Sequence, residues 1–222
     1  MLSLFRKYSS GLLASSGMDL SLRLDEAPYV VLDTELTGLD FRNDSIVSVG
    51  ALRMVGTRIE VSRPFYEVVR PSTELTSSSI VIHEITPSES ALKPGIEAIM
   101  EGFLSFCEGA MIVGHFISLD LRFLAKEMKR IGYGPLKNPA VDTAVIHDWM
   151  RENRGDFSSS YFAVTETKDL FSLAKKFQVP VQGAHNALMD AYVTAQLFQR
   201  FIAMLIKLGV RTLRDLLRIG KP

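Results

Sequence analysis

Apolar residues form short continuous runs in the first two thirds of the chain and recur at helical spacing towards its end. Short runs bounded by polar, glycine or proline residues are typical of buried strands. Gly56-Thr57, between two such runs, predicts an antiparallel hairpin. The runs that we expect to form strands cover residues 29–33, 46–55, 58–69, 111–115 and 140–144.

Three segments show apolar residues at three- and four-residue spacing, which predicts amphipathic helices. Strand and helix alternate after the hairpin, so an α/β fold is expected. The three apolar stripes are Ile96, Ile99, Met100, Phe103, Leu104 and Cys107; Leu119, Phe123, Leu124 and Met128; and Leu188, Ala191, Ala195, Phe198, Ile202 and Leu205.

Two carboxylates, Asp33 and Glu35, follow the first apolar run. Side chains alternate across a strand, so residues two apart project from one face and these acids must crowd together. A divalent cation would relieve their repulsion, and oxygen ligands suit Mg²⁺ or Mn²⁺ rather than Zn²⁺. The alternative is an ordinary buried strand with a polar exit.

Two further acids lie at strand-to-helix or loop-to-helix junctions. Asp120 falls in the first turn of the helix after 111–115, where it could equally complement the helix dipole near Ser118, a possible N-cap. Asp190 lies in the last long helix, five residues after His185. Five helical residues correspond to about 500° of rotation, so we expect His185 on the loop before that helix. There it could act as a general base or be a surface histidine.

These segments resemble the DEDDh family of 3′→5′ exonucleases, which includes the epsilon proofreading subunit of bacterial DNA polymerase III and ribonuclease T. The order of the motifs matches from about residue 28 to 201. The resemblance implies a ribonuclease H-like fold with a mixed five-stranded sheet flanked by helices. The matching motifs are Asp33-Thr34-Glu35-Leu36-Thr37-Gly38, His115-Phe116-Ile117-Ser118-Leu119-Asp120 and His185-Asn186-Ala187-Leu188-Met189-Asp190-Ala191.

The resemblance also implies the site. Two Mg²⁺ or Mn²⁺ ions would be held by the four carboxylates, with Asp33 bridging them and His185 taking a proton from the attacking water. Terminal phosphodiesters would be hydrolysed to nucleoside 5′-monophosphates. The implied catalytic residues are Asp33, Glu35, Asp120, His185 and Asp190, and the implied substrate contacts are Leu36, Thr37, Gly38, Leu39, His83, Phe116 and Leu119.

The chain departs from the family at three positions. Phe116 and Leu119 stand where relatives commonly carry Asn and Phe, and Glu84 replaces the glycine of an H-G-I-T segment. We therefore expect a permissive pocket, in which stacking on Phe116 replaces a polar contact. Asp142 is expected to be structural and is left out of the site.

Three functions stay open on the sequence alone. The first is a 3′→5′ exonuclease that acts on single-stranded DNA ends, and the second is an exoribonuclease that trims RNA ends by the same chemistry. The third is a non-catalytic module that docks a polymerase or another partner. Five intact motif positions argue against the third.

Composition fits one domain. The chain has 222 residues, 47% of them hydrophobic, so it can bury a core without disulfides. Cys107 is the single cysteine, which favours a reducing, cytoplasmic location. No apolar run approaches the roughly 18 residues of a membrane span. We expect an amphipathic N-terminal extension over residues 1–27 that packs on the domain or a partner and is not a secretory signal, with an organelle transit peptide as the alternative. An exonuclease domain is expected over 28–208, and a basic helix packed on it over 209–222.

The formal net charge is zero, which is unusual for a protein that binds nucleic acid tightly. Weak salt-driven affinity is therefore expected, with a polymerase or other partner to deliver the strand. In the C-terminal segment Thr212 and Asp215 predict a capping box. Arg214 and Arg218, four residues apart in this segment, could lie on a solvated helix face or bind successive phosphates. Tyr161 and Phe162, in the polar stretch 150–169, could stack on bases or anchor a loop.

Overall fold

The computed structural model describes residues 17–153, 168–181, 183 and 185–222. Its sheet has five strands in the order β3, β2, β1, β4, β5. The first three are antiparallel neighbours, and β4 and β5 join in parallel. The strands are β1 (Pro28–Leu36), β2 (Ile46–Val55), β3 (Arg58–Val68), β4 (Met111–Gly114) and β5 (Ala140–Asp142). The mixed five-stranded sheet is as expected.

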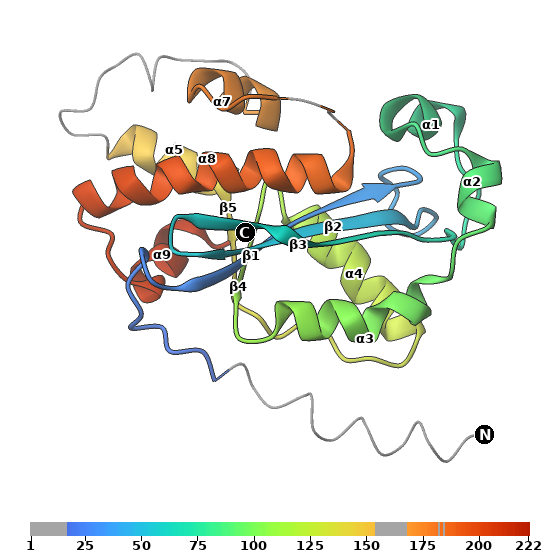
Figure 1. Cartoon of the computed structure of the whole chain (residues 1–222), viewed down its shortest axis with the longest axis horizontal. Helices are drawn as coiled ribbons and strands as arrows, with labels where there is room; N and C mark the ends of the chain where they lie inside the picture. The colour runs from blue at the N-terminus through green and yellow to red at the C-terminus, as the bar shows by residue number, and fades with distance from the viewer. Residues whose placement is uncertain (1–16, 154–167, 182, 184) are drawn as a thin grey trace.

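Helices cover both faces of the sheet (Figure 1). The helices are α1 (Ser77–His83), α2 (Pro87–Ala91), α3 (Ile96–Cys107), α4 (Ser118–Arg130), α5 (Thr143–Glu152), α7 (Leu170–Lys176), α8 (Ala187–Lys207) and α9 (Leu213–Gly220). In the part of the chain that the structure describes, no helix combines the length and apolar character that a membrane crossing requires.

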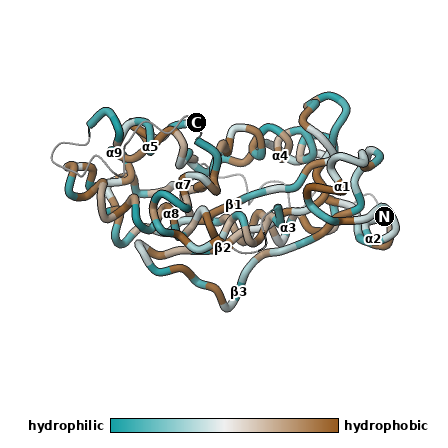
Figure 2. The backbone as a smooth tube through the Cα atoms, turned by 90° about the horizontal axis from the view of Figure 1, so that it is seen from above, coloured by the Kyte–Doolittle hydropathy of each residue, from teal (hydrophilic) through white to brown (hydrophobic). Residues whose placement is uncertain are grey.

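Alternate residues of β1 enter two separate cores. Tyr29 and Val31 pack with α5, α7, α8 and α9, whereas Val30 and Leu32 pack with α3 and α4. Apolar and polar residues alternate along these helices, as expected for helices with one face on a core (Figure 2). Continuous apolar runs in the strands thus result from burial on both faces.

Both chain ends of the domain meet at α9. Its N-cap, Thr212, forms the expected capping box with Asp215. The described part of the N-terminal extension packs beside it, through a β-bridge between Arg23 and Thr212 and full burial of Leu24. α9 lies at the opposite end of the molecule from α1 (Figure 1).

The expectation that Ser118 caps its helix was wrong. Ser118 is the first residue of α4, and the N-cap, Ile117, makes no side-chain capping bond. The backbone N–H groups of Phe116 and Ile117 instead donate to the Asp142 carboxylate, at 3.2 and 3.0 Å. The strand expected at 140–144 ends at Asp142, because Thr143 already begins α5 and Asp142 caps it. Tyr161 and Phe162 lie outside the described residues.

Gly50 sets how closely α8 approaches the sheet. It is the β2 partner of Asp33. An ideal Cβ on Gly50 would lie 2.2 Å from the backbone carbon of Ala187, the first residue of α8. Any side chain at Gly50 must therefore push the start of α8 away from the sheet, and with it Asp190, one turn further on.

We expect Gly50→Ala to lower the free energy of unfolding by about 1–3 kcal/mol, because overpacking displaces backbone. It should also lower nuclease activity at least tenfold. Gly102→Ala is the matched control, since the nearest atom to its Cβ would be in ordinary contact at 3.8 Å and alanine favours a helix interior. Denaturant melts and turnover of both variants make the comparison. Equal behaviour of the two would contradict the role assigned to Gly50.

Candidate active site

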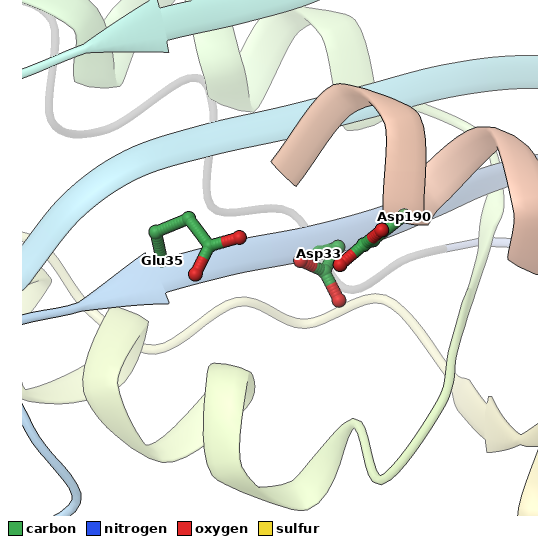
Figure 3. Close-up of side chains that lie close together, drawn as sticks. All are labelled: Asp33, Glu35 and Asp190. Carbon is green, nitrogen blue, oxygen red and sulfur yellow. The ribbon is translucent and has the colours of Figure 1, made fainter. Parts of the chain in front are cut away.

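Three carboxylates meet where β1 ends beneath the start of α8 (Figure 3). Asp33 and Glu35 project from one face of β1, as their spacing predicts, and Asp190 comes from the first turn of α8. Each offers an oxygen, and these oxygens all lie within 4.8 Å of one another. The chain thus brings together three of its four motif acids in one cluster, which is close enough to share a cation.

The surroundings of these acids oppose their ionisation. Burial, followed by the charges of Asp120, Glu35 and Asp190, raises the pKa of Asp33 well above its usual value. Burial and the neighbouring acids raise the pKa of Glu35 to about 8, and burial raises that of Asp190 to about 6. Without a cation, the cluster therefore holds protons near neutral pH.

Asp120 stands beside this cluster rather than within it. Its Oδ1 accepts two hydrogen bonds from Thr34, at 2.9 Å from the backbone N–H and 2.6 Å from the hydroxyl. Burial raises its pKa to about 7 despite these bonds. Because Thr34 lies between Asp33 and Glu35 in β1, the two hydrogen bonds join α4 directly to the strand segment that carries these two acids.

His185 lies on the loop before α8, as its spacing from Asp190 predicts. Its backbone N–H donates to Asp190 Oδ2 at 3.2 Å. The imidazole is exposed and meets the Phe171 ring edge-on at a centroid distance of 5.4 Å. The structure therefore places this ring next to the carboxylate cluster and open to water, without making it a member of the cluster.

Asn186 and Tyr66 hold the beginning of α8, and no sequence pattern predicts the part that Tyr66 plays. The Asn186 side chain caps the helix through the N–H groups of Leu188 and Met189. Its amide nitrogen donates to the Tyr66 hydroxyl, on β3, at 3.0 Å. Tyr66 is the β3 partner of Gly50, so one cross-strand row joins Tyr66, Gly50 and Asp33. Only the register of the sheet reveals this link.

Phe116 presents an aromatic ring at the entrance to α4. It is 51% exposed and has a left-handed backbone, with φ of 53°. Its ring meets that of His115 at 4.6 Å. His115 is itself buried, with Nδ1 bonded to the Thr143 hydroxyl and Nε2 to the Lys168 carbonyl, each at 2.8 Å. Asp142 thus has the structural role expected of it, since it fixes the backbone that carries Phe116.

Four of the predicted substrate contacts lie at the end of β1 and in the loop that follows it. Leu39 is 77% exposed, and Leu36 is half-buried. Thr37 is fully buried, and its hydroxyl donates to Asp44 and accepts from the N–H of Ser45. Gly38 faces the Asp44 carboxylate, which a Cβ would meet at 2.4 Å. Thr37 and Gly38 therefore shape the loop, while Leu39 is the side chain that it exposes.

The remaining predicted contacts differ in exposure. His83 is buried, and its Nδ1 accepts from the Ile85 N–H at 3.1 Å, which leaves the proton on Nε2. The Nε2–H group of His83 is buried and has no hydrogen-bond partner among the described residues. Glu84 is exposed and ends α1 with a φ of 60°, a conformation that explains glycine in relatives. Leu119 is half-buried on the core side of α4.

Comparison with known proteins agrees with this arrangement. Residues 30–198 match the family model described as exonuclease, of the RNase T type. The chain is 33% identical over 191 residues to a PolC-type DNA polymerase III of Thermotoga maritima, covering 86% of this chain and 13% of that protein. It is 32% identical over 192 residues to a DNA polymerase III subunit epsilon-like protein of Rhodobacter capsulatus, covering 85% and 26%.

The fold is also shared with solved structures. Exonuclease I of E. coli, in complex with a dT13 oligonucleotide, superposes with a TM-score of 0.72 at 18% identity, over 83% of this chain and 43% of that one. The chain thus spans less than half of each of these three relatives. Since the family model matches most of its length, this chain belongs to the exonuclease family of the RNase T type.

Proposed function

We propose that this protein is a metal-dependent 3′→5′ exonuclease that releases nucleoside 5′-monophosphates from single-stranded DNA ends. The observation that carries the proposal is the cluster of half-buried Asp33 and Glu35 with buried Asp190, whose oxygens lie within 4.8 Å of one another. Without a cation such a cluster destabilises the folded state, because each charge is poorly solvated and repelled by the others. A bound cation accounts for it.

The donor set fits Mg²⁺ or Mn²⁺. All donors are carboxylate oxygens, and Asp190 Oδ1 is buried without a hydrogen-bond partner among the described residues. We assign one ion to Asp33, Glu35 and Asp190, and a second to Asp33 and Asp120 Oδ2, the oxygen that Thr34 leaves unused. When bound, two such ions stabilise the attacking and leaving oxygens of an in-line displacement.

The chain's own residues supply the proton transfer and the positioning. His185 would accept the proton of the attacking water, since its imidazole is open to solvent and lies beside Asp190. Phe116 and Leu39 would contact the bases at the 3′ end, and the Nε2–H of His83 would donate to an acceptor on the terminal nucleotide.

DNA is favoured over RNA by the relatives, whose names include PolC-type DNA polymerase III, a subunit epsilon-like protein and an exonuclease I bound to dT13. The same names favour a polymerase as the partner that delivers the strand and a cytoplasmic place of action. A net charge of zero agrees with delivery, because long-range attraction to phosphates is weak.

The experiment that tests the proposal is a time course on end-labelled single-stranded DNA and RNA with Mg²⁺, Mn²⁺ or chelator. We expect shortening from the 3′ end of DNA, and none with chelator. Asp33→Asn, Glu35→Gln, Asp120→Asn and Asp190→Asn should each abolish nearly all activity while the fold is kept. Glu101→Gln, an exposed acid on α3, is the matched control. Full turnover by any of the four site variants would refute the two-metal assignment.

Stability of the metal-free protein should fall as the pH rises. The folded-state pKa of Glu35 is about 8 against an ordinary 4.5, so between these values the folded state binds more protons than the unfolded state. Its stabilising contribution is therefore complete below about pH 4.5 and lost as the pH passes 8. Thermal melts in chelator should show this decline, Glu35→Gln should flatten it, and Mg²⁺ should raise Tm more at pH 8 than at pH 6. A chelated wild type that is more stable at pH 8 would contradict the assignment.

His185→Ala should lower kcat by about 10²–10⁴-fold with little change in Mn²⁺ affinity, because the imidazole acts on water and is not a ligand. The wild-type pH–rate profile should have a rising limb that the variant lacks, because the variant has no base to accept the proton. The measurement is a pair of pH–rate profiles at saturating Mn²⁺. An identical limb in both proteins would remove His185 from the role of base.

A further inference from the structure

A cationic group is held in a fixed position beside the active site. Arg122 lies on α4, two residues after Asp120, and its guanidinium carbon sits 4.8 Å from the centre of the Phe41 ring. Phe41 in turn meets Phe123 edge-on at 5.9 Å. One turn later, Lys126 Nζ donates to the Asp44 carbonyl at 2.6 Å. The loop that follows the first motif is thereby fastened to the helix that carries Asp120.

The stacked guanidinium keeps its donors available. Stacking uses the flat face of the group, and its five N–H donors point outward in the plane. Arg122 is exposed, and among the ion pairs found in the described part of the chain none involves Arg122 or Lys126. The two acids of the loop are engaged within it: Asp44 accepts from Thr37 and from the N–H of Asp40, and Asp40 accepts from the N–H of Arg42 and from Asn43.

The segment that contains α1 and α2 has the reverse charge. Between Arg70 and Lys93 it includes Glu74, Glu84 and Glu89 and neither lysine nor arginine. A polyanion leaving the carboxylate cluster would be repelled on that side and attracted on the α4 side. In a chain of zero net charge, such local differences decide the path of the strand.

We propose that Arg122, stacked on Phe41, binds a phosphate of the single-stranded substrate on the 5′ side of the scissile bond, with Lys126 adding charge behind it. This inference rests on the proposed nuclease function and adds the route by which the strand leaves the site. Arg122 and Lys126 lie on a different face of α4 from Asp120, and their side chains reach Phe41 and Asp44 in the loop that follows Glu35. They are therefore placed along that loop, which a strand leaving the carboxylates would pass.

The binding test compares Arg122→Gln with Arg214→Gln, an exposed arginine on α9 at the far end of the molecule (Figure 1). Anisotropy of a labelled single-stranded oligonucleotide is titrated in chelator over a range of salt, with thermal melts to verify folding. Arg122→Gln should weaken binding at low salt about fivefold to tenfold and reduce the slope of log affinity against log salt by about 0.7. Arg214→Gln should match the wild type. A slope for Arg122→Gln equal to that of the wild type overturns the proposal.

The kinetic test uses the ratio of kcat/KM for a long oligonucleotide to that for a dinucleotide. The ratio should fall about fivefold in Arg122→Gln and less in Arg122→Lys, which keeps the charge but loses the stacked plane. An equal loss of kcat/KM on both substrates, with an unchanged salt slope, would mean that Arg122 only holds the loop in place. That result overturns the proposal. If the wild type hydrolyses neither substrate, the nuclease function fails, while the salt slope still decides whether Arg122 binds phosphate.

Discussion

The close approach of α8 to the sheet at Gly50 is the constraint on which the rest of the structure depends. α8 begins directly on the backbone of β2, and from there it covers β1 and β2 and contributes more buried residues to the larger core than any other described element. The same approach brings Asp190 over Asp33. Packing and site assembly therefore have a common origin, because the contact that allows the core to close also sets the distance between two acids from opposite ends of the chain.

The cluster of Asp33, Glu35 and Asp190 lowers the stability of the fold that contains it. Asp33 and Glu35 are half-buried and Asp190 is buried, their pKa values are raised, and their mutual repulsion lowers stability when they are ionised. The fold withstands this through two cores on the two faces of β1, and through local ties at each acid. Thr34 holds Asp120, the backbone of His185 holds Asp190, and Tyr66 braces the cap of α8. The carboxylate oxygens are thus placed in advance for the cation that we propose.

Sequence patterns could predict the parts of this fold whose determinants are local. The strands at 46–55 and 111–114, the hairpin at Gly56 and the capping box of Thr212 follow from residues that are neighbours in the chain. The pairing of Asp33 with Glu35 is equally local, since it needs only the alternation of a strand. The family resemblance supplied the rest of the candidate site, because no local pattern joins residues 33, 120 and 190.

Features without an apolar stripe, and features that depend on tertiary contact, were missed. The short helices α1 and α2 lack an apolar stripe and are set by the caps Thr76 and Thr86. Ser118 has the chemistry of an N-cap, yet the helix begins one residue earlier than that role requires, where the Asp142 carboxylate from β5 accepts from the N–H groups of Phe116 and Ile117. Tyr66 and Arg122 carry no motif, and their contacts with Asn186 and Phe41 exist only in the folded chain.

The left-handed backbone of Phe116 changes how the family's asparagine at this position is understood. Asparagine adopts a positive φ more readily than other side chains, whereas a bulky aromatic residue is strained there. An asparagine could therefore be retained in relatives for the turn that it permits, even if its amide touched no substrate. In this chain the Asp142 carboxylate accepts from the N–H groups of Phe116 and Ile117, and this pair of hydrogen bonds holds an aromatic residue in a conformation that it would otherwise avoid.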